Sequence, residues 1–228
     1  MKQHTQQFQT LIKSKGSQSV ERRDFLFATS LLTAFGGLPQ HALGAVQTPL
    51  SGDPLKPVLL PAMPPLEHKG GMDIRVWMRS AMTNGRFSSV ECAVAPKLMG
   101  PSPHHHKELD ELMLVLEGRA SVLIGDDVVE VEAGGWHLRS HGITHTFWNA
   151  SDKPLRFMDM YFNQPFEEYL ERTFHELTPE NGFPDNSEKK KKERDFLTEK
   201  FGIVHSPTAR EERKAIADKY GLKLPAPR

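Results

Sequence analysis

The chain has 228 residues, a formal net charge of zero and a single cysteine. The length suits one domain with extensions or two small domains, and a charged fraction of 25% beside a hydrophobic fraction of 38% is typical of a globular protein. Cys92 has no second cysteine to pair with, which excludes an intrachain disulfide and a zinc site built only from cysteines. A global basic excess is absent, so we expect no nucleic-acid partner.

The net charge is the sum of three unlike segments. Residues 1–45 carry five Lys or Arg against two Asp or Glu, residues 46–186 carry twelve against twenty, and residues 187–228 carry twelve against seven. Six of the eleven histidines lie between His104 and His145. The middle of the chain is therefore acidic and rich in histidine.

The first 45 residues have the order of an export signal. Arg22 and Arg23, followed by Phe25 and Leu26, resemble the twin-arginine export signal of bacteria. A mildly apolar stretch and a group of small residues at 42–45 follow, as in a cleavable signal. We expect a periplasmic or secreted protein that meets the membrane only during export. An uncleaved anchor, or an amphipathic helix with a chance arginine pair, is the alternative.

After a proline-rich linker or edge segment at 46–71, the sequence predicts a region of short strands from 72 to 162. The strands are separated by turn signals such as Asn84–Gly85 and 125–127, and no long helical pattern interrupts them. Such spacing predicts an antiparallel sandwich or a small barrel. The expected strands cover residues 74–78, 87–95, 111–116, 120–124, 128–131, 144–148 and 155–162.

Residues 163–228 carry helical signals. Pro165 suits the start of a helix, and apolar residues follow it at helical spacing as far as Leu177. Two more helices are expected at 188–201 and 208–220, each with a glycine at its exit. Lys189–Lys192 is interpreted as a solvated helix face, with a basic docking patch as the sharper alternative.

The histidine-rich stretch suggests a metal site. In a strand, His104 and His106 point to one face and His105 to the other. Glu111 begins a strand that can pair alongside, and His145 lies at the start of a further strand. Three imidazoles and one carboxylate suit Mn²⁺, Fe²⁺, Co²⁺, Ni²⁺, Cu²⁺ or Zn²⁺.

These residues resemble the two sequence motifs of the cupin superfamily. The first motif, a His-x-His pair followed by a glutamate and a glycine, is matched by His104, His106, Glu111 and Gly118. The second, with spaced glycines, a histidine and an asparagine, is matched by Gly134, Gly142, His145 and Asn149. Two departures concern turns: Ser140 stands where the motif has proline, and the gap from Gly100 to His104 is two residues short.

The resemblance implies an all-β fold, an antiparallel double-stranded β-helix (the jelly-roll or cupin barrel) over residues 72–162, with a C-terminal helical extension. It also implies one divalent transition metal held by His104, His106, Glu111 and His145, with Fe²⁺ or Mn²⁺ favoured over Ni²⁺, Cu²⁺ or Zn²⁺. A homodimer is the expected assembly.

Strand alternation also gives a provisional substrate pocket. Met113 and Val115 share the face of Glu111, Phe147 and Asn149 share the face of His145, and His141 lies in the preceding turn. Asp159 stands in an otherwise apolar strand, and alternation alone does not orient it.

The resemblance is nearest to small cupins of the quercetin-dioxygenase-like type, so we expect a metal-dependent, dioxygenase-like oxidoreductase acting on a small organic substrate. The alternatives are a cupin decarboxylase or isomerase, and a non-catalytic periplasmic module that binds a small molecule. A third alternative is an interaction protein that works through its C-terminal tail.

Overall fold

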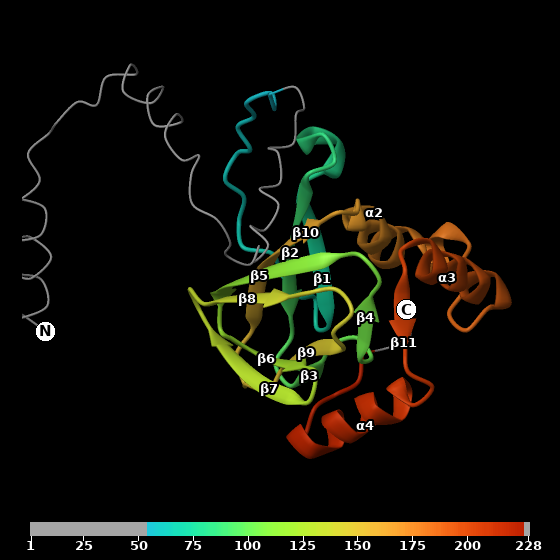
Figure 1. The fold of residues 1–228 in the computed structure, drawn as a ribbon. Coiled ribbons are helices and arrows are strands. Elements are labelled where there is room, and N and C mark those ends of the chain that lie inside the picture. The colour runs from blue at the N-terminus through green and yellow to red at the C-terminus, as the bar shows by residue number, and fades with distance from the viewer. Residues whose placement is uncertain (1–53, 226–228) are drawn as a thin grey trace, which may run out of the picture. The chain divides into compact units, whose positions relative to one another are not determined.

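Two antiparallel sheets form the body of the protein in a computed structural model that describes residues 54–225 (Figure 1). The export-signal residues Arg22, Arg23, Phe25 and Leu26 lie outside the described residues. The five-stranded sheet has the order β1 (Met72–Met78), β2 (Phe87–Val94), β10 (Leu155–Phe162), β5 (Asp110–Glu117) and β8 (Trp136–Arg139). The six-stranded sheet has the order β11 (Ile203–His205), β4 (His104–His106), β9 (His145–Asn149), β6 (Arg119–Ile124) and β7 (Asp127–Glu132), and β3 (Leu98–Met99) also pairs with β9.

The side chains that alternate along the strands fill the space between the sheets. Strand β10 shows the pattern: Leu155, Phe157, Asp159 and Tyr161 are buried, and the residues between them are partly exposed. Burying a large apolar side chain contributes about 1.5–3 kcal/mol, so the strands of both sheets are held by their inner faces. This arrangement confirms the predicted fold class, an antiparallel double-stranded β-helix.

A glycine makes one connection between strands possible. Gly118 joins β5 to β6 with φ +76°, and a Cβ added there would lie 2.4 Å from the carbonyl oxygen of Pro154. Only glycine tolerates both the left-handed backbone and this close approach. Position 118 therefore requires a glycine for steric reasons that are independent of any metal site.

The C-terminal extension packs on the barrel through α2 (Phe166–Glu171), a π-helical turn (Arg172–Glu176), α3 (Glu188–Lys200) and α4 (Ala209–Tyr220). Short 3₁₀ turns lie at Ser80–Thr83 and Pro179–Asn181. Apolar side chains of the extension enter the same core as the strands, and α4 packs Ala217 and Tyr220 beside Trp148 of β9. The extension is not purely helical, because it also supplies strand β11, which the sequence did not predict. Among residues 54–225, no helix is long and apolar enough to span a bilayer.

The lysine run of α3 is only partly a solvated face. Lys191 and Lys192 are exposed, as expected. Lys190 is buried and donates to Asp185 over 2.6 Å, while the Lys189 ammonium lies 4.0 Å from the ring centre of Phe183. Half of the run therefore secures the turn that precedes α3.

Candidate metal centre

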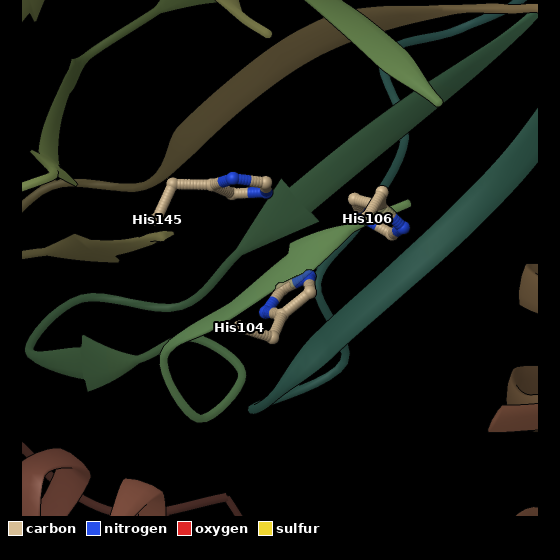
Figure 2. A group of neighbouring side chains, drawn as sticks. All are labelled: His104, His106 and His145. Atoms are coloured by element: carbon tan, nitrogen blue, oxygen red, sulfur yellow. The ribbon is translucent and has the colours of Figure 1, made fainter. Parts of the chain in front are cut away.

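Three histidines meet inside the barrel, His104 and His106 from β4 and His145 from β9. One ring nitrogen of each histidine lies within 4.8 Å of a ring nitrogen of the other two. His104, His106 and His145 are 8%, 0% and 2% exposed. The two strands are antiparallel with His104 directly opposite His145, which brings the rings to one place. Figure 2 shows the ring of His145 directed toward the two rings from β4.

The loop before β4 is fixed by a close backbone approach. The Gly100 N–H donates to the carbonyl oxygen of Phe147 over 3.0 Å, and a Cβ on Gly100 would lie 2.1 Å from that oxygen. The Thr146 hydroxyl donates to the carbonyl oxygen of Pro101 over 2.7 Å. These contacts tie the start of the His-x-His segment to β9, so the shortened gap between Gly100 and His104 is accommodated.

Two of the imidazoles have their tautomer set by a backbone carbonyl. His104 Nδ1 lies 2.9 Å from the oxygen of Ser102, and His145 Nδ1 lies 3.0 Å from the oxygen of Ile143. A carbonyl only accepts, so Nδ1 carries the proton and Nε2 keeps its lone pair. Burial and the neighbouring His145 and His106 hold the pKa of His104 well below its usual range, so this ring is neutral near pH 7. A neutral imidazole is the form that binds a metal.

The remaining ring nitrogens are buried without hydrogen bonds. Both nitrogens of His106 and Nε2 of His145 have no hydrogen-bond partner among the described residues. Glu111 Oε1 lies 3.4 Å from His106 Nε2, and Oε2 lies 3.0 Å from His145 Nε2, but neither contact has hydrogen-bond geometry. Leaving such groups unpaired costs about 1–3 kcal/mol each, and one shared cation would satisfy one nitrogen of His106 and Nε2 of His145. The donor set therefore fits a divalent transition metal.

Glu111, the fourth predicted ligand, lies beside this cluster and also forms an ion pair with Arg139. Arg139 Nε donates to Glu111 Oε2 over 2.8 Å, and both side chains are buried. Burial opposes ionisation, but the adjacent Arg139 outweighs it and holds the pKa of Glu111 well below its usual range. The carboxylate is therefore ionised, with Oε1 directed to His106 and Oε2 shared with Arg139.

Arg139 is the centre of a buried network that the sequence reasoning missed. It is 1% exposed, and its second nitrogen donates to Asp159 Oδ1 over 2.7 Å. The Tyr161 hydroxyl lies 3.4 Å from Asp159 Oδ2. Burial raises the pKa of Asp159 to about 6, and Glu111, which shares the same arginine, adds to the effect of burial. Asp159 thus faces the interior, which alternation had left open.

The predicted pocket residues have different surroundings. Met113 is buried with its sulfur 3.9 Å from Arg139 Nη1, and Val115 is buried opposite Phe157 of β10. The ring of Phe147 packs against that of Phe157 with the ring centres 5.0 Å apart. The Asn149 amide donates to the carbonyl oxygens of Ala95 and Lys153, so it anchors the turn after β9. His141 is exposed and its Nδ1 lies 2.7 Å from Asp110 Oδ1. In these contacts the side chains of Asn149 and His141 are both engaged with other groups of the protein.

An aromatic wall from the extension adjoins the cluster. The rings of Phe166 and His106 meet edge to face with their centres 5.0 Å apart. The rings of Tyr169 and Phe201 from the extension, and of Tyr161 from β10, have their centres within 6 Å of that of Phe166. Two surface hollows of about 420 and 310 Å³ lie along α3, and neither includes a histidine of the cluster. On the side of the extension, the three imidazoles are therefore bordered by an aromatic side chain.

Comparison with known proteins gives a family match for part of the chain. Residues 90–161 match the family described as Cupin domain, and a search of curated proteins gave no match. A protein with a double-stranded β-helix domain from Klebsiella pneumoniae is 18% identical, with 43% of this chain and 83% of that chain covered and a TM-score of 0.38. A sugar phosphate isomerase from Silicibacter pomeroyi is 20% identical over 40% of this chain and 60% of its own, with a TM-score of 0.35. An oxalate oxidase is 20% identical, with 42% of this chain and 53% of that chain covered and a TM-score of 0.36.

The family match and the fold support a place for this chain in the cupin superfamily. Within the matched residues, the three converging histidines form a site that could hold a metal ion. The matched residues contain every histidine of the cluster, together with Glu111 and the Arg139 network.

Proposed function

We propose that the protein is a mononuclear-metal enzyme of the cupin type that acts on a small organic substrate, with dioxygenase-type chemistry preferred. The observation that carries the proposal is the convergence of His104, His106 and His145, with unpaired ring nitrogens buried beside an ionised carboxylate. A divalent metal held there, Fe²⁺ or Mn²⁺ in preference to Ni²⁺, Cu²⁺ or Zn²⁺, supplies a Lewis acid with coordination positions left for substrate.

The residues of the chain have separate tasks in this proposal. The carbonyl oxygens of Ser102 and Ile143 hold the tautomers of His104 and His145. Arg139 keeps Glu111 ionised and fixes the direction of its carboxylate. Phe166 covers His106 from the side of the extension and excludes water there.

The proposal is tested in two steps. Elemental analysis of the purified protein comes first, and we expect close to one transition-metal ion per chain. Oxygen uptake by protein loaded with Fe²⁺, Mn²⁺, Ni²⁺ or Cu²⁺ is then measured across small phenolic and carboxylic-acid substrates. Turnover without oxygen uptake would indicate the decarboxylase or isomerase alternative. Metal binding without any turnover would leave the non-catalytic binding module.

We also propose export by the twin-arginine route, supported by the order of Arg22, Arg23, Phe25 and Leu26 before an apolar stretch. Replacing both arginines with lysine should retain the protein in the cytoplasm of a bacterial host. Fractionation with the wild-type chain as the control measures this. Normal export of the double-lysine variant would remove the proposed localisation.

A homodimer is a further proposal. Its support is the outer surface of edge strand β8, where Trp136 is 55% exposed and Leu138 is 57% exposed. Light scattering of the purified protein should give twice the chain mass, and a Trp136→Ser, Leu138→Ser double variant should give the mass of one chain.

A further inference from the structure

The strand that carries two of the three histidines is weakly tied to the rest of the barrel. Strand β4 shares only one register pair with β9, His104 opposite His145. One more backbone bond reaches it from the barrel, from the N–H of Gly142 to the oxygen of His106 over 2.8 Å. By contrast, β9 and β6 share four register pairs. A strand paired at one position does not by itself fix the direction of the side chains along it.

The C-terminal extension supplies the missing partner. Strand β11 pairs with β4 along its whole length, with Ile203 opposite His106, Val204 opposite His105 and His205 opposite His104 (Figure 1). The pairing continues past the strand, because the Lys107 N–H donates to the oxygen of Gly202 over 3.0 Å. The ring of His205 lies 5.6 Å from that of His104. The strand with the metal ligands is thus held mainly by a segment about 100 residues later in the chain.

Two further contacts from the extension reach the loop before β4. Arg213 Nε of α4 donates to the carbonyl oxygen of Gly100 over 2.9 Å. The backbone of Lys223 bonds on both sides of Leu98, accepting from the Met99 N–H over 2.9 Å and donating to the Lys97 oxygen over 2.7 Å. The segment from residue 97 to residue 107 is therefore held by the extension at three separate points.

The extension is itself anchored in the barrel core. Ile203 and Phe201 are buried in the same apolar cluster as the inner residues of the five-stranded sheet. Phe201 packs against Phe166, whose ring contacts His106. The position of β11 is therefore set by the barrel, and β11 in turn sets the position of β4.

We propose that β11 is a positioning element of the metal centre: its pairing with β4 holds His104 and His106 where they meet His145, so that the C-terminal extension sets the affinity for metal. Val204 is the positioning residue within it. This inference rests on the proposed metal centre, and it assigns a role to a part of the chain outside the residues that match the cupin family.

A proline at position 204 tests the pairing directly. Because the Lys107 N–H donates to Gly202, the two-residue alternation of an antiparallel ladder directs the Val204 N–H toward β4 as well. Val204→Pro removes that donor. The matched control is Val128→Pro in β7, the opposite edge of the same sheet. In the full, metal-free chain we expect amide exchange at His105 to Lys107 to accelerate at least tenfold in Val204→Pro and to remain unchanged in Val128→Pro.

A gentler pair of variants covers the case in which the proline variant does not fold. Gly202 has φ +61° and an added Cβ would lie 3.3 Å from the Cβ of Lys107, whereas Gly125 has φ +59° with nothing within 4 Å. Both alanine variants carry similar backbone strain, but only Gly202→Ala pushes on the end of β4. We expect exchange of the β4 amides to accelerate about threefold in Gly202→Ala and not in Gly125→Ala.

Zinc affinity then connects the strand to the metal centre. Competition of Zn²⁺ with a chromophoric chelator should give a Kd at least tenfold higher for Val204→Pro, about threefold higher for Gly202→Ala, and within twofold of wild type for both controls. Unchanged exchange at β4 in the variants, or faster exchange with unchanged zinc affinity, would overturn the positioning role. Failure of the wild-type chain to bind zinc would count against the metal centre, and the exchange rates would still decide whether β11 holds β4.

Discussion

The barrel interior contains two groups of buried polar side chains that differ in how they are satisfied. The histidine cluster has ring nitrogens with no hydrogen-bond partner among the described residues. The adjacent group is centred on Arg139, whose guanidinium donates to Glu111 and Asp159 over 2.8 and 2.7 Å. Both groups are almost fully buried, so the difference between them is one of chemistry rather than of exposure.

This difference separates a group that a bound ion would satisfy from a group that already has its own partners. Unpaired buried nitrogens raise the free energy of the protein unless a bound species satisfies them, whereas a network with internal partners needs none. Glu111 belongs to both groups, because it faces two histidines and accepts from the arginine. It is the residue through which the network can orient the metal centre.

The largest effect is expected from removing the cation of the network. Arg139→Met leaves Glu111 and Asp159 buried without a positive partner, and breaking such a pair costs about 3–5 kcal/mol. Urea unfolding of the metal-free protein at pH 7 measures the loss. Arg119→Met is the control, because Arg119 pairs with Glu130 at the surface and its loss should cost less than about 1 kcal/mol. Equal losses in the two variants would show that the Arg139 network contributes no more than a surface ion pair.

A smaller effect, and of a different kind, is expected in the histidine cluster. His145→Ala should lower zinc affinity at least about 100-fold, equivalent to about 2.7 kcal/mol. The stability of the metal-free protein should change by only about 1 kcal/mol, because the lost packing is offset by removal of an unpaired buried nitrogen. His141→Ala, in the preceding exposed turn, is the control and should keep full affinity. A large loss of metal-free stability with little change in affinity would make His145 a framework residue.

Part of this contrast was predictable from the sequence. Strand alternation predicted that His104 and His106 share one face, because side chains in a strand follow a period of two, and the structure brings both beside His145. The resemblance to the cupin motifs also pointed to His145 and Glu111, and Glu111 lies beside the cluster. Asp159 was recognised as unusual in an apolar strand. Its direction became clear only from the register of β10 with β5, where Asp159 lies opposite Met113.

Arg139 escaped notice because residues 136–139 were not among the expected strands, and strand β8, which lies there, inverts the usual pattern. Its apolar residues Trp136 and Leu138 are more than half exposed, while Arg139 is buried. The rule that apolar residues lie inside would direct Trp136 and Leu138 to the core and Arg139 to the solvent, which is the reverse of what is found. The one available signal was that Arg139 and His137 share a face of this strand. That signal becomes meaningful only once the interior is known to contain carboxylates. Strand β11 was also missed, because three residues between two helices carry no period of their own and are recognised as a strand only from their pairing with the outer edge of β4.

The smallest predicted effect concerns the second carboxylate of the network. One arginine faces two carboxylates, and burial raises the pKa of Asp159 to about 6 from an ordinary value of 3.8. The folded protein therefore holds a proton that the unfolded chain has lost, and Asp159 costs stability progressively as the pH rises from about 4 to about 6. Asp159→Asn keeps an oxygen for Arg139 without the charge. Relative to wild type, the metal-free variant should gain about 1 kcal/mol between pH 4.5 and pH 7.5 in urea unfolding. Asp152→Asn, at an exposed position, should gain nothing. The same gain in both variants, or none in Asp159→Asn, would mean that Arg139 fully compensates both carboxylates without a metal.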